Sequence, residues 1–304
     1  MTDHPSVSII IPTRNAAGWL ARAIFSIGPM AEAEILVVDD GSTDSTTELL
    51  AEFAAHDPRL RVLPGAGKGA AAARNLAIAA ARAPLIAFLD ADDRWRLGKL
   101  EAQLAFHAAH PEMGFSFTDY RHITAEREDR GPCFAYWPRF AQSLAGRESP
   151  FLVEAAPAAL LAENVVGTST VMARTDLLRE LGGFDRDMPQ SEDWDLWLRL
   201  AARAPVGCLP EVLMDYTMHR PGNLSGQRSA RLAAMRIIAD RHGPAAQQLD
   251  PSALRICAAR LLVAAAEAAA ADGARLKAAW LHLGVALRQP ARRHFREAAA
   301  VLLR

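Results

Sequence analysis

The stretch LIAFLDADDRW, residues 85–95, contains three aspartates within four positions. Asp90, Asp92 and Asp93 follow a run of apolar residues typical of a buried strand. Side chains two positions apart in extended chain point to the same side, so Asp90 and Asp92 should face a common ligand. Hard carboxylate oxygens suit Mg²⁺ or Mn²⁺, with substrate phosphates completing the coordination. The pattern predicts a divalent metal bound together with a diphosphate. A single aspartate in this position would more often be a turn residue or a helix cap.

Alternating strands and helices are expected to position these acids. The β-branched or apolar runs that predict strands are 6–11, 34–39, 61–63, 85–90 and 168–174. Helical spacing predicts helices over 16–27, from Thr43 or Asp44 onward, after the Gly-rich turn at 65–70, and over 191–203. Strands separated by helices favour a largely parallel sheet covered on both faces. Ligands of such sheets bind at the carboxyl ends of the strands, where Pro12, Asp39, Asp40, Asp90 and Asp92 all lie.

Length, charge and cysteine content exclude several classes of protein. The 304 residues are 51% hydrophobic and suffice for one large domain with an appendage, or for two domains. A formal net charge of −1 gives no reason to expect a nucleic-acid partner. The three cysteines, Cys133, Cys208 and Cys257, are far apart in the sequence. This spacing favours reduced, buried thiols in a cytosolic protein over disulfides or a metal site. No secretory signal and no apolar run of about 18 residues is seen. Residues 119–165, rich in Pro, Arg and aromatics, read as an irregular insertion or active-site loop.

The C-terminal region differs in composition from the rest. Residues 226–304 are Ala-rich and carry 13 Lys/Arg against 5 Asp/Glu, which suggests a helical second region after a domain of residues 1–225. Helix breaks are expected at 243–244, 272–273 and 289–290. Two uses of these helices stay open. The apolar spacing of Leu276, Trp280, Leu283 and Leu287 favours packing on the preceding domain or on a second copy. The basic residues instead favour peripheral attachment to anionic lipid, through Arg288, Arg292, Arg293 and Arg296.

Residues 6–225 resemble a glycosyltransferase of family 2, which has the nucleotide-sugar-binding fold called GT-A. The matching segments are SIIIPTRN (8–15), VVDDGSTDST (37–46), ARN (73–75), FLDADDRW (88–95), GGFD (182–185), SEDWDLWLRL (191–200) and YTMHRPGNLS (216–225). Each segment is a weak signal alone, but their order is specific. The resemblance implies an α/β fold with a central, mostly parallel, Rossmann-like sheet flanked by helices. The C-terminal α-helical region lies outside it.

The resemblance also implies a nucleotide site. The residues that match it are Pro12, Thr13, Asn15, Asp40, Arg74 and Asp90. In the family the carboxylate at Asp40 accepts a hydrogen bond from the base, usually uracil, whose N3–H is a donor. Asp90 lies near the ribose and Arg74 near the nucleotide. Simpler interpretations remain: Asp39 and Asp40 could be ordinary turn residues, and Arg74 a solvent-facing helix residue.

A metal and a base complete what the resemblance implies. Mn²⁺ or Mg²⁺ would bind Asp92 and Asp90, with His219 as a further ligand on a loop over the diphosphate. In the simpler interpretation His219 has only a structural role. Sugar transfer needs a base for the acceptor hydroxyl, and Asp193 matches the family's base with Glu192 as its neighbour. Both acids would lie in the first turn of a helix capped by Ser191, where they could instead only complement the helix dipole. Asp93 would orient the site.

The function expected from these residues is metal-dependent, inverting transfer of a sugar. The donor would be a nucleotide-diphosphate sugar, most simply a UDP-sugar, and the acceptor a hydroxyl of a glycan, a lipid-linked molecule or another compound. This activity is expected of a hexosyltransferase of polysaccharide biosynthesis. The protein would be cytoplasmic or peripheral at the inner face of the membrane. Two other classes stay open. GAGKGA (65–70) with Asp90 satisfies the fingerprint of an NAD(P)-dependent Rossmann oxidoreductase. A nucleotide- or carbohydrate-binding module without catalysis would need no base.

Overall fold

A computed structural model describes residues 5–124, 126–218 and 228–288 of the chain. The chain divides into two compact units, each described by itself below. The sheet unit consists of Met1–Val153, Val165–Arg186 and Arg199–Arg220. The helical unit consists of Glu154–Asn164, Asp187–Leu198 and Pro221–Arg304. Residues around 154–164 and 187–198 therefore group with the C-terminal helices.

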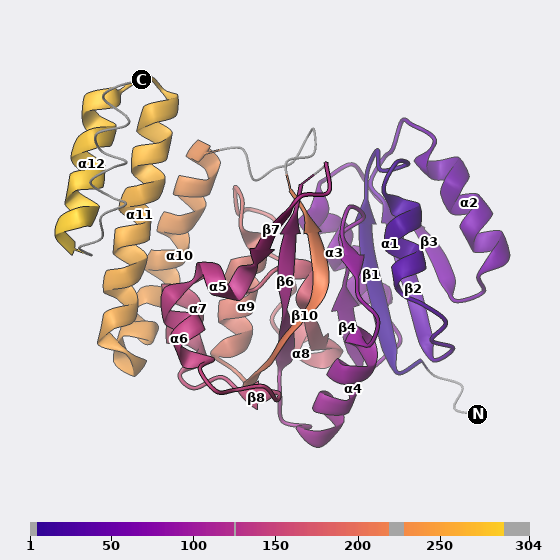
Figure 1. Ribbon diagram of the computed structural model, residues 1–304. Coiled ribbons are helices and arrows are strands. Elements are labelled where there is room, and N and C mark those ends of the chain that lie inside the picture. Colours follow the sequence, from indigo (N-terminus) through magenta and orange to yellow (C-terminus); the bar gives the residue numbers. More distant parts are fainter. Residues whose placement is uncertain (1–4, 125, 219–227, 289–304) are drawn as a thin grey trace. The chain divides into compact units, whose positions relative to one another are not determined.

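One ten-stranded sheet forms the sheet unit (Figure 1). Its strands follow the order β3 (Leu60–Pro64), β2 (Ala33–Asp39), β1 (Val7–Thr13), β4 (Leu85–Phe88), β9 (Met172–Arg174), β6 (Phe115–Ile123), β10 (Val206–Thr217) and β5 (Arg94–Trp95). Off this path, β7 (Asp129–Pro132) pairs with β6 and β8 (Phe151–Leu152) pairs with β10. β1 to β4, β6 and β10 all run in one direction, while β5, β7, β8 and β9 are short and antiparallel to their neighbours. The expected mostly parallel α/β sheet is confirmed.

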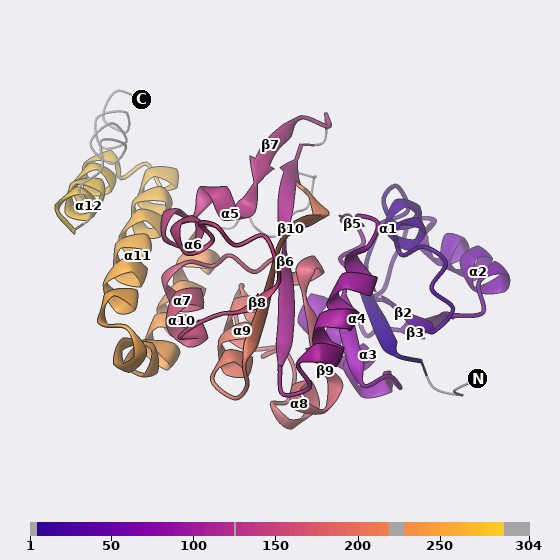
Figure 2. The ribbon, with the colours of Figure 1, turned by 60° about the horizontal axis from the view of Figure 1, so that its bottom comes forward.

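Helices cover the sheet as the alternation of elements predicts. They are α1 (Leu20–Ser26), α2 (Thr46–His56), α3 (Ala70–Ala80), α4 (Lys99–Ala109), α5 (Cys133–Tyr136), α6 (Pro138–Ser143) and α8 (Thr175–Glu180). Alternate residues of β1 share one core cluster with Leu20, Leu50 and Leu100, which belong to α1, α2 and α4. The helix α3 packs on β1 and β2, and α8 packs on α3 and β9. Figure 2 shows the same unit from another side. The cysteines Cys133, Cys208 and Cys257 are free and buried, as expected.

Several sequence expectations for the sheet unit are wrong. The stretch 119–165 is largely regular, because β6 continues to Ile123 and turns back into β7, and helices follow. Residues 168–174 begin with a 3-10 turn, η1 (Thr168–Thr170), before β9. The long strand β10 was not expected, because Pro210 and two register shifts beside β6 interrupt its alternation.

Packed helices form the helical unit. They are α7 (Ala156–Ala162), most of α9 (Glu192–Ala201), α10 (Arg228–Leu249), α11 (Pro251–Ala271) and α12 (Arg275–Arg288). The helix α11 packs on α7, α10 and α12. Asp250 caps α11 by accepting a hydrogen bond from Ser252 N. The expected break at Gly243–Pro244 is wrong, since α10 continues through Pro244. A Cβ at Gly243 would lie 2.9 Å from Leu254 Cδ1, so close helix packing explains this glycine.

The apolar stripe of α12 is not covered by the other helices of this unit. Leu276, Trp280 and Leu283 are 73%, 74% and 37% exposed. The buried face of α12 consists instead of Ala278, Ala279, His282, Val285 and Ala286. The end of α11 at Ala271 confirms the break at 272–273, whereas 289–290 and the side chain of Leu287 lie outside the described residues. Arg292, Arg293 and Arg296 also lie outside them. Among the described helices, none is long and apolar enough to cross a membrane.

Candidate functional site

Asp40 joins three segments at the carboxyl edge of the sheet. Its backbone N–H donates to Thr13 O at the end of β1 (2.8 Å). Its carboxylate accepts from the backbone N–H groups of Lys68 (3.2 Å) and Gly69 (2.7 Å), in the turn before α3. The side chain is buried. Gly65 makes this possible, because a Cβ there would lie 2.7 Å from Asp40 Cα and 2.8 Å from its Oδ1. Asp40 was expected at this edge from the sequence, whereas the role of Gly65 has no signal in the sequence beyond the Gly-rich turn.

The neighbouring Asp39 has the simpler role of a turn residue. Its carboxylate accepts from Ser42 N (3.0 Å) and from Thr47 Oγ1 (2.9 Å), at the start of α2. Asn15 ties the end of β1 to the same turn: its N–H donates to Ser42 Oγ (2.9 Å) and its Oδ1 accepts from Thr43 N (2.8 Å). The φ angle of 50° at Asn15 is one that asparagine tolerates better than most residues. Asn15 therefore shapes the loop beside the predicted nucleotide site.

Pro12 and Thr13 end β1 at this edge, as expected. Pro12 pairs in register with Val38 and Thr13 with Asp39, so the ends of β1 and β2 lie side by side. Thr13 is buried, and its Oγ1 has no hydrogen-bond partner among the residues that the structure describes. A buried hydroxyl without a partner costs free energy, which a bound ligand can recover. Thr13 is thus available to contact a molecule bound at the end of β1.

Arg74 is a buried partner of Asp90 and not a solvent-facing helix residue. Arg74 Nη2 lies 2.6 Å from Asp90 Oδ1, and the guanidinium lies over the ring of Phe184, 5.2 Å from its centroid. Asn75 holds Phe184 there, because its Nδ2 donates to Phe184 O and its Oδ1 accepts from Phe184 N, both at 2.8 Å. A side chain at Gly183 would collide with Asn75 Oδ1. These contacts explain why the ARN and GGFD segments belong to one site.

Residues far away in the chain hold the acidic loop that follows β4. Ser169 Oγ donates to Asp93 Oδ2 (2.5 Å) and accepts from Asp90 N (2.9 Å). Thr217, at the end of β10, donates from its N to Asp93 Oδ1 (3.1 Å) and from its Oγ1 to Asp92 O (2.6 Å). Sequence reasoning missed Ser169 and Thr217, although Thr217 stands inside the YTMHRPGNLS segment. They fix the backbone that carries Asp90 and Asp92.

Asp93 supports the loop from inside, as expected. It is buried, whereas Asp90 and Asp92 are partly exposed. Burial, followed by the negative charges of Asp92 and Asp90, raises the pKa of Asp93 well above its usual range. The three carboxylates are therefore close enough to repel one another, and Arg74 is the cation that contacts Asp90.

This acidic loop fits a divalent cation in part. Asp90 and Asp92 supply hard oxygen donors and an excess of negative charge. Within residues 5–124, 126–218 and 228–288, no three His, Cys, Asp or Glu side chains are grouped to hold a metal ion. Further ligands would have to come from phosphate oxygens, water or other residues, which is the usual case for Mg²⁺. His219 lies outside the described residues.

The predicted base and its neighbour lie at the start of α9, in the helical unit. The helix begins at Glu192, directly after Ser191, and both Glu192 and Asp193 are partly exposed. Asp193 Oδ1 accepts from Trp194 N (2.7 Å). The dipole of a helix N-terminus favours the ionised carboxylate that a base requires.

The side chains after Asp193 anchor α9 to α7, α10 and α11. Trp194 Nε1 donates to Leu160 O (2.8 Å), and Arg260 lies over its ring, 5.2 Å from the centroid. Asp195 is fully buried, and its Oδ1 lies 2.9 Å from His242 Nε2 and 3.3 Å from Arg241 Nη1. The C-terminal helices therefore fix the turn that presents Asp193. The acidic pattern SEDWD does not reveal these partners.

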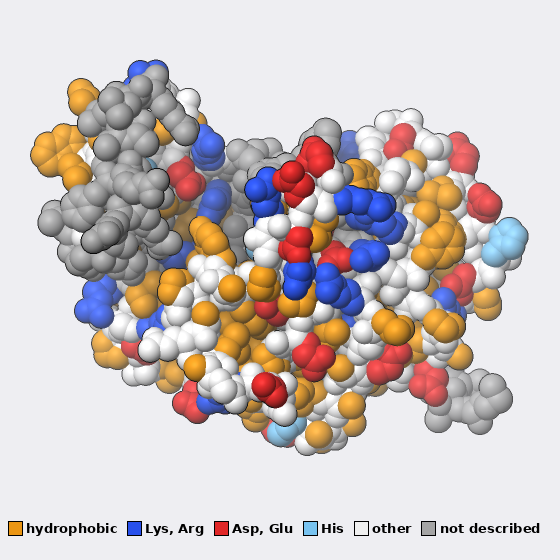
Figure 3. All heavy atoms as spheres, viewed as in Figure 1, with side chains coloured by type: hydrophobic (Ala, Val, Ile, Leu, Met, Phe, Trp, Pro, Cys, Tyr) orange, Lys and Arg blue, Asp and Glu red, His pale blue; other side chains and the backbone are white. Residues whose placement is uncertain are grey.

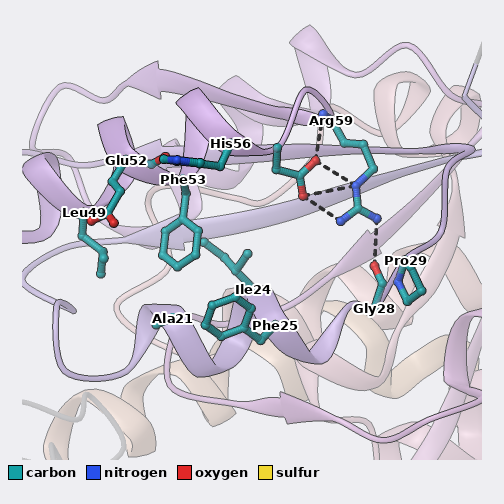
Figure 4. A pocket seen from close by; sticks show the side chains of 11 residues that line it. Ala21, Ile24, Phe25, Gly28, Pro29, Leu49, Glu52, Phe53, His56 and Arg59 are labelled. Carbon is teal, nitrogen blue, oxygen red and sulfur yellow. Dashed lines mark hydrogen bonds and ion pairs between the residues drawn. The ribbon is translucent and has the colours of Figure 1, made fainter.

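A pocket elsewhere in the sheet unit includes none of the predicted residues. It has a volume of about 670 Å³ and lies between α1 and α2, beside the edge-to-face rings of Phe25 and Phe53 (Figure 4). Arg59 closes one end, where its guanidinium binds the Asp57 carboxylate and Gly28 O. These polar groups satisfy one another, and the pocket offers no group of catalytic type beyond Glu52 and His56. The chemistry is therefore assigned to the acidic edge of the sheet.

Comparisons with known proteins identify the family and the fold. Residues 8–155 match the family described as Glycosyl transferase family 2. An uncharacterized glycosyltransferase of Rickettsia felis is 33% identical over 214 residues, which cover 68% of this chain and 32% of that protein. The chain thus spans about a third of the length of this relative.

Two solved structures share the fold. S. aureus TarS 1–349 in complex with UDP-GlcNAc has a TM-score of 0.66 and 19% identity, and the match covers 97% of this chain and 88% of TarS 1–349. The mannosyltransferase PcManGT from Pyrobaculum calidifontis, in complex with GDP-Man and Mn²⁺, has a TM-score of 0.61 and 23% identity, and the match covers 99% of this chain and 86% of the other. The expected GT-A fold with C-terminal helices is confirmed.

Proposed function

Because this chain belongs to glycosyltransferase family 2, we propose that it transfers a sugar from a nucleotide-diphosphate donor to an acceptor hydroxyl, with inversion at the anomeric carbon. The observation that carries the proposal is the convergence of Thr13, Asp40, Arg74, Asp90 and Asp92 at the carboxyl edge of the sheet. Parallel α/β sheets bind their ligands at this edge.

The donor is proposed to be a UDP-sugar. The oxygens of Asp40 accept two amide hydrogen bonds and retain further lone pairs for the N3–H of uracil. The buried Oγ1 of Thr13 is a second polar group for the base. TarS is described with UDP-GlcNAc and PcManGT with GDP-Man, so the choice of base is the part that requires measurement.

Asp90 and Asp92 would hold Mn²⁺ or Mg²⁺ together with the donor's diphosphate, with His219 as a further ligand. The bound metal would neutralise the negative charge that grows on the leaving diphosphate. Arg74 would stay beside Asp90 and add a positive charge at the same place. The Mn²⁺ complex of PcManGT supports a divalent metal for this fold.

Asp193 would act as the base. Its partly exposed carboxylate, in the first turn of α9, would accept the proton of the acceptor hydroxyl as the oxygen attacks. Glu192 stands beside it in the same turn and would help orient the hydroxyl. A single base on the side opposite the leaving group gives inversion.

The acceptor is proposed to be a hydroxyl of a glycan or a lipid-linked molecule, as in polysaccharide biosynthesis. Tyr216, the neighbour of Thr217 in β10, pairs with His122 of β6. Their partly exposed rings lie 5.8 Å apart and could contact a sugar face. A dehydrogenase is disfavoured by the Gly-rich turn, because two of its amides, at Lys68 and Gly69, donate to Asp40. In a dinucleotide fold such amides are needed for the pyrophosphate.

Calorimetric titration tests the donor site. We expect UDP to bind more tightly than GDP, dTDP or NAD, and only in the presence of Mn²⁺. Asp92→Asn should weaken this binding, while Asp176→Asn, which changes a surface acid paired with Arg174, should leave it unchanged. Binding of NAD without metal would contradict the proposal.

Turnover with UDP-sugars tests the base. Asp193→Asn should abolish transfer and leave UDP affinity nearly intact, and Asp240→Asn, on the exposed side of α10, serves as its control. A protein that binds UDP and manganese but transfers no sugar to water or any acceptor would be a binding module.

A further inference from the structure

The helix α12 exposes an apolar stripe that the helical unit leaves uncovered. Leu276, Trp280 and Leu283 stand at positions i, i+4 and i+7, so they lie on one side of the helix. Their exposed fractions, 73%, 74% and 37%, contrast with the fully buried Ala278 on the opposite side. Figure 3 shows hydrophobic side chains at the surface in this part of the chain. Large exposed side chains in a row mark a contact surface.

The charges on α12 and in the sequence that follows it are mostly positive. Arg275 and Lys277 are exposed in the first turn of α12, and Arg288 is its last residue. From Gly273 to Arg304 the sequence has seven Lys and Arg residues and a single acid, Glu297. The region that follows the break after α11 is therefore cationic and amphipathic.

We propose that α12 lies flat on an anionic lipid surface. The side chains of Leu276, Trp280 and Leu283 enter the boundary between head groups and acyl chains, where tryptophan is favoured. Arg275 and Lys277 contact the lipid phosphates. No described helix is long and apolar enough to cross a membrane, and the proposed contact runs along the side of α12. The proposal concerns attachment and stands whether or not the donor assignment is correct.

A second copy of the chain fits this surface less well. In a two-fold interface the same stripe meets itself, so the cationic groups of the two helices would be brought together. Such repulsion has no compensation on α12, because the described part of the helix contains no Asp or Glu. Three side chains also provide much less than the roughly 800 Å² per partner of a stable interface. An anionic membrane neutralises the same charges.

Vesicle binding of the full chain tests the proposal. We expect co-sedimentation with vesicles of phosphatidylcholine mixed with phosphatidylglycerol, weakened by salt, and none with phosphatidylcholine alone. Tryptophan fluorescence should shift to shorter wavelength on binding. Trp280→Ala should lower the partition coefficient about tenfold or more and remove the shift. Leu97→Ala, which removes an exposed leucine (95%) of the sheet unit, should have no effect.

Two results would overturn the proposal. One is equal binding of wild type and Trp280→Ala to the anionic vesicles, or no binding by either. The other is a concentration-dependent dimer in sedimentation velocity that Trp280→Ala abolishes, because the stripe would then serve a second copy. Because Trp280 is exposed, the variant should fold normally, and an unchanged melting temperature checks this.

Discussion

Replacing Gly65 by alanine should damage the nucleotide end of the site. The new Cβ would lie 2.7 Å from Asp40 Cα, 2.8 Å from Asp40 Oδ1 and 2.9 Å from Asp39 O. Ordinary contacts begin at 3.4 Å, so the chain must move by about 0.7 Å. Two of these three atoms belong to the backbone, and hydrogen bonds hold it in place. Gly65 N donates to Asp39 O and Asp40 N to Thr13 O, both at 2.8 Å.

The expected cost follows from these contacts. Overpacking of this kind costs about 1–3 kcal/mol. If the Asp40 carboxylate moves, its hydrogen bonds from Lys68 N and Gly69 N weaken, and a hydrogen bond to a charged group contributes about 1.5–3 kcal/mol. We therefore expect the free energy of unfolding to fall by about 2–5 kcal/mol, and UDP affinity to fall at least about tenfold.

Urea denaturation and UDP titration measure the two effects separately. Gly18→Ala is the matched control, because a Cβ at Gly18 meets no atom within 4 Å. It should change stability by less than about 0.5 kcal/mol. If Gly65→Ala proves as stable as Gly18→Ala, the close approach to Asp40 is wrong. If Gly65→Ala is unstable but binds UDP normally at low temperature, Asp40 does not belong to the nucleotide site.

Three further predictions concern buried charges. Burial raises the pKa of Asp119 to about 6, so the native state binds its proton more tightly than the unfolded chain. The contribution of Asp119 to stability should therefore fall by up to about 3 kcal/mol as pH rises from about 4 to about 6. Asp119→Asn should remove that fall, as urea denaturation over this pH range would show. Burial lowers the pKa of His107 to about 4, so the native state binds its proton less tightly than the unfolded chain. The contribution of the neutral His107 to stability is therefore full above about pH 6.5 and is lost as pH falls through about 4. This loss should also amount to about 3 kcal/mol. His107→Gln should remove this loss in the same experiment. His242→Leu deprives the buried Asp195 of a hydrogen bond and should cost about 1–3 kcal/mol, of which His242→Gln should recover most.

The first two variants check each other. Their titrations have opposite sign and overlap in pH, so Asp119→Asn and His107→Gln should diverge from the wild type in opposite directions. Parallel curves for all three proteins would show that neither side chain is desolvated as described. For the third, equal stability of His242→Leu and His242→Gln would mean that the hydrogen bond to Asp195 adds nothing.

Local patterns predicted the elements that are buried on both faces. β1 and β2 were recognisable because the middle of each is an unbroken run of apolar, mostly β-branched residues, Ile9–Ile11 and Ile35–Val38. β10 was not, because Pro210, Glu211 and two register shifts disrupt the alternation on which recognition depends. At Pro244 the sequence predicted a helix break, but α10 continues through this residue. The loss of one helical hydrogen bond is tolerated there because α10 packs closely on α11.

The sequence by itself determined the types of the elements, the acids at the strand ends and the order of the family's segments. The hydrophobic periodicity of a strand (two residues) or a helix (3.6 residues) is a local property, and so is the chemistry of a single side chain. Asp90, Asp92 and Asp193 could therefore be named as candidates without a structure. The partners of these acids were decided only by the tertiary structure. Thr217 reaches Asp92 across 125 positions of the chain, and no local pattern specifies which distant segment closes on a loop. The same holds for the exposure of Trp280, since helical spacing shows which residues share a face but not whether another element covers it.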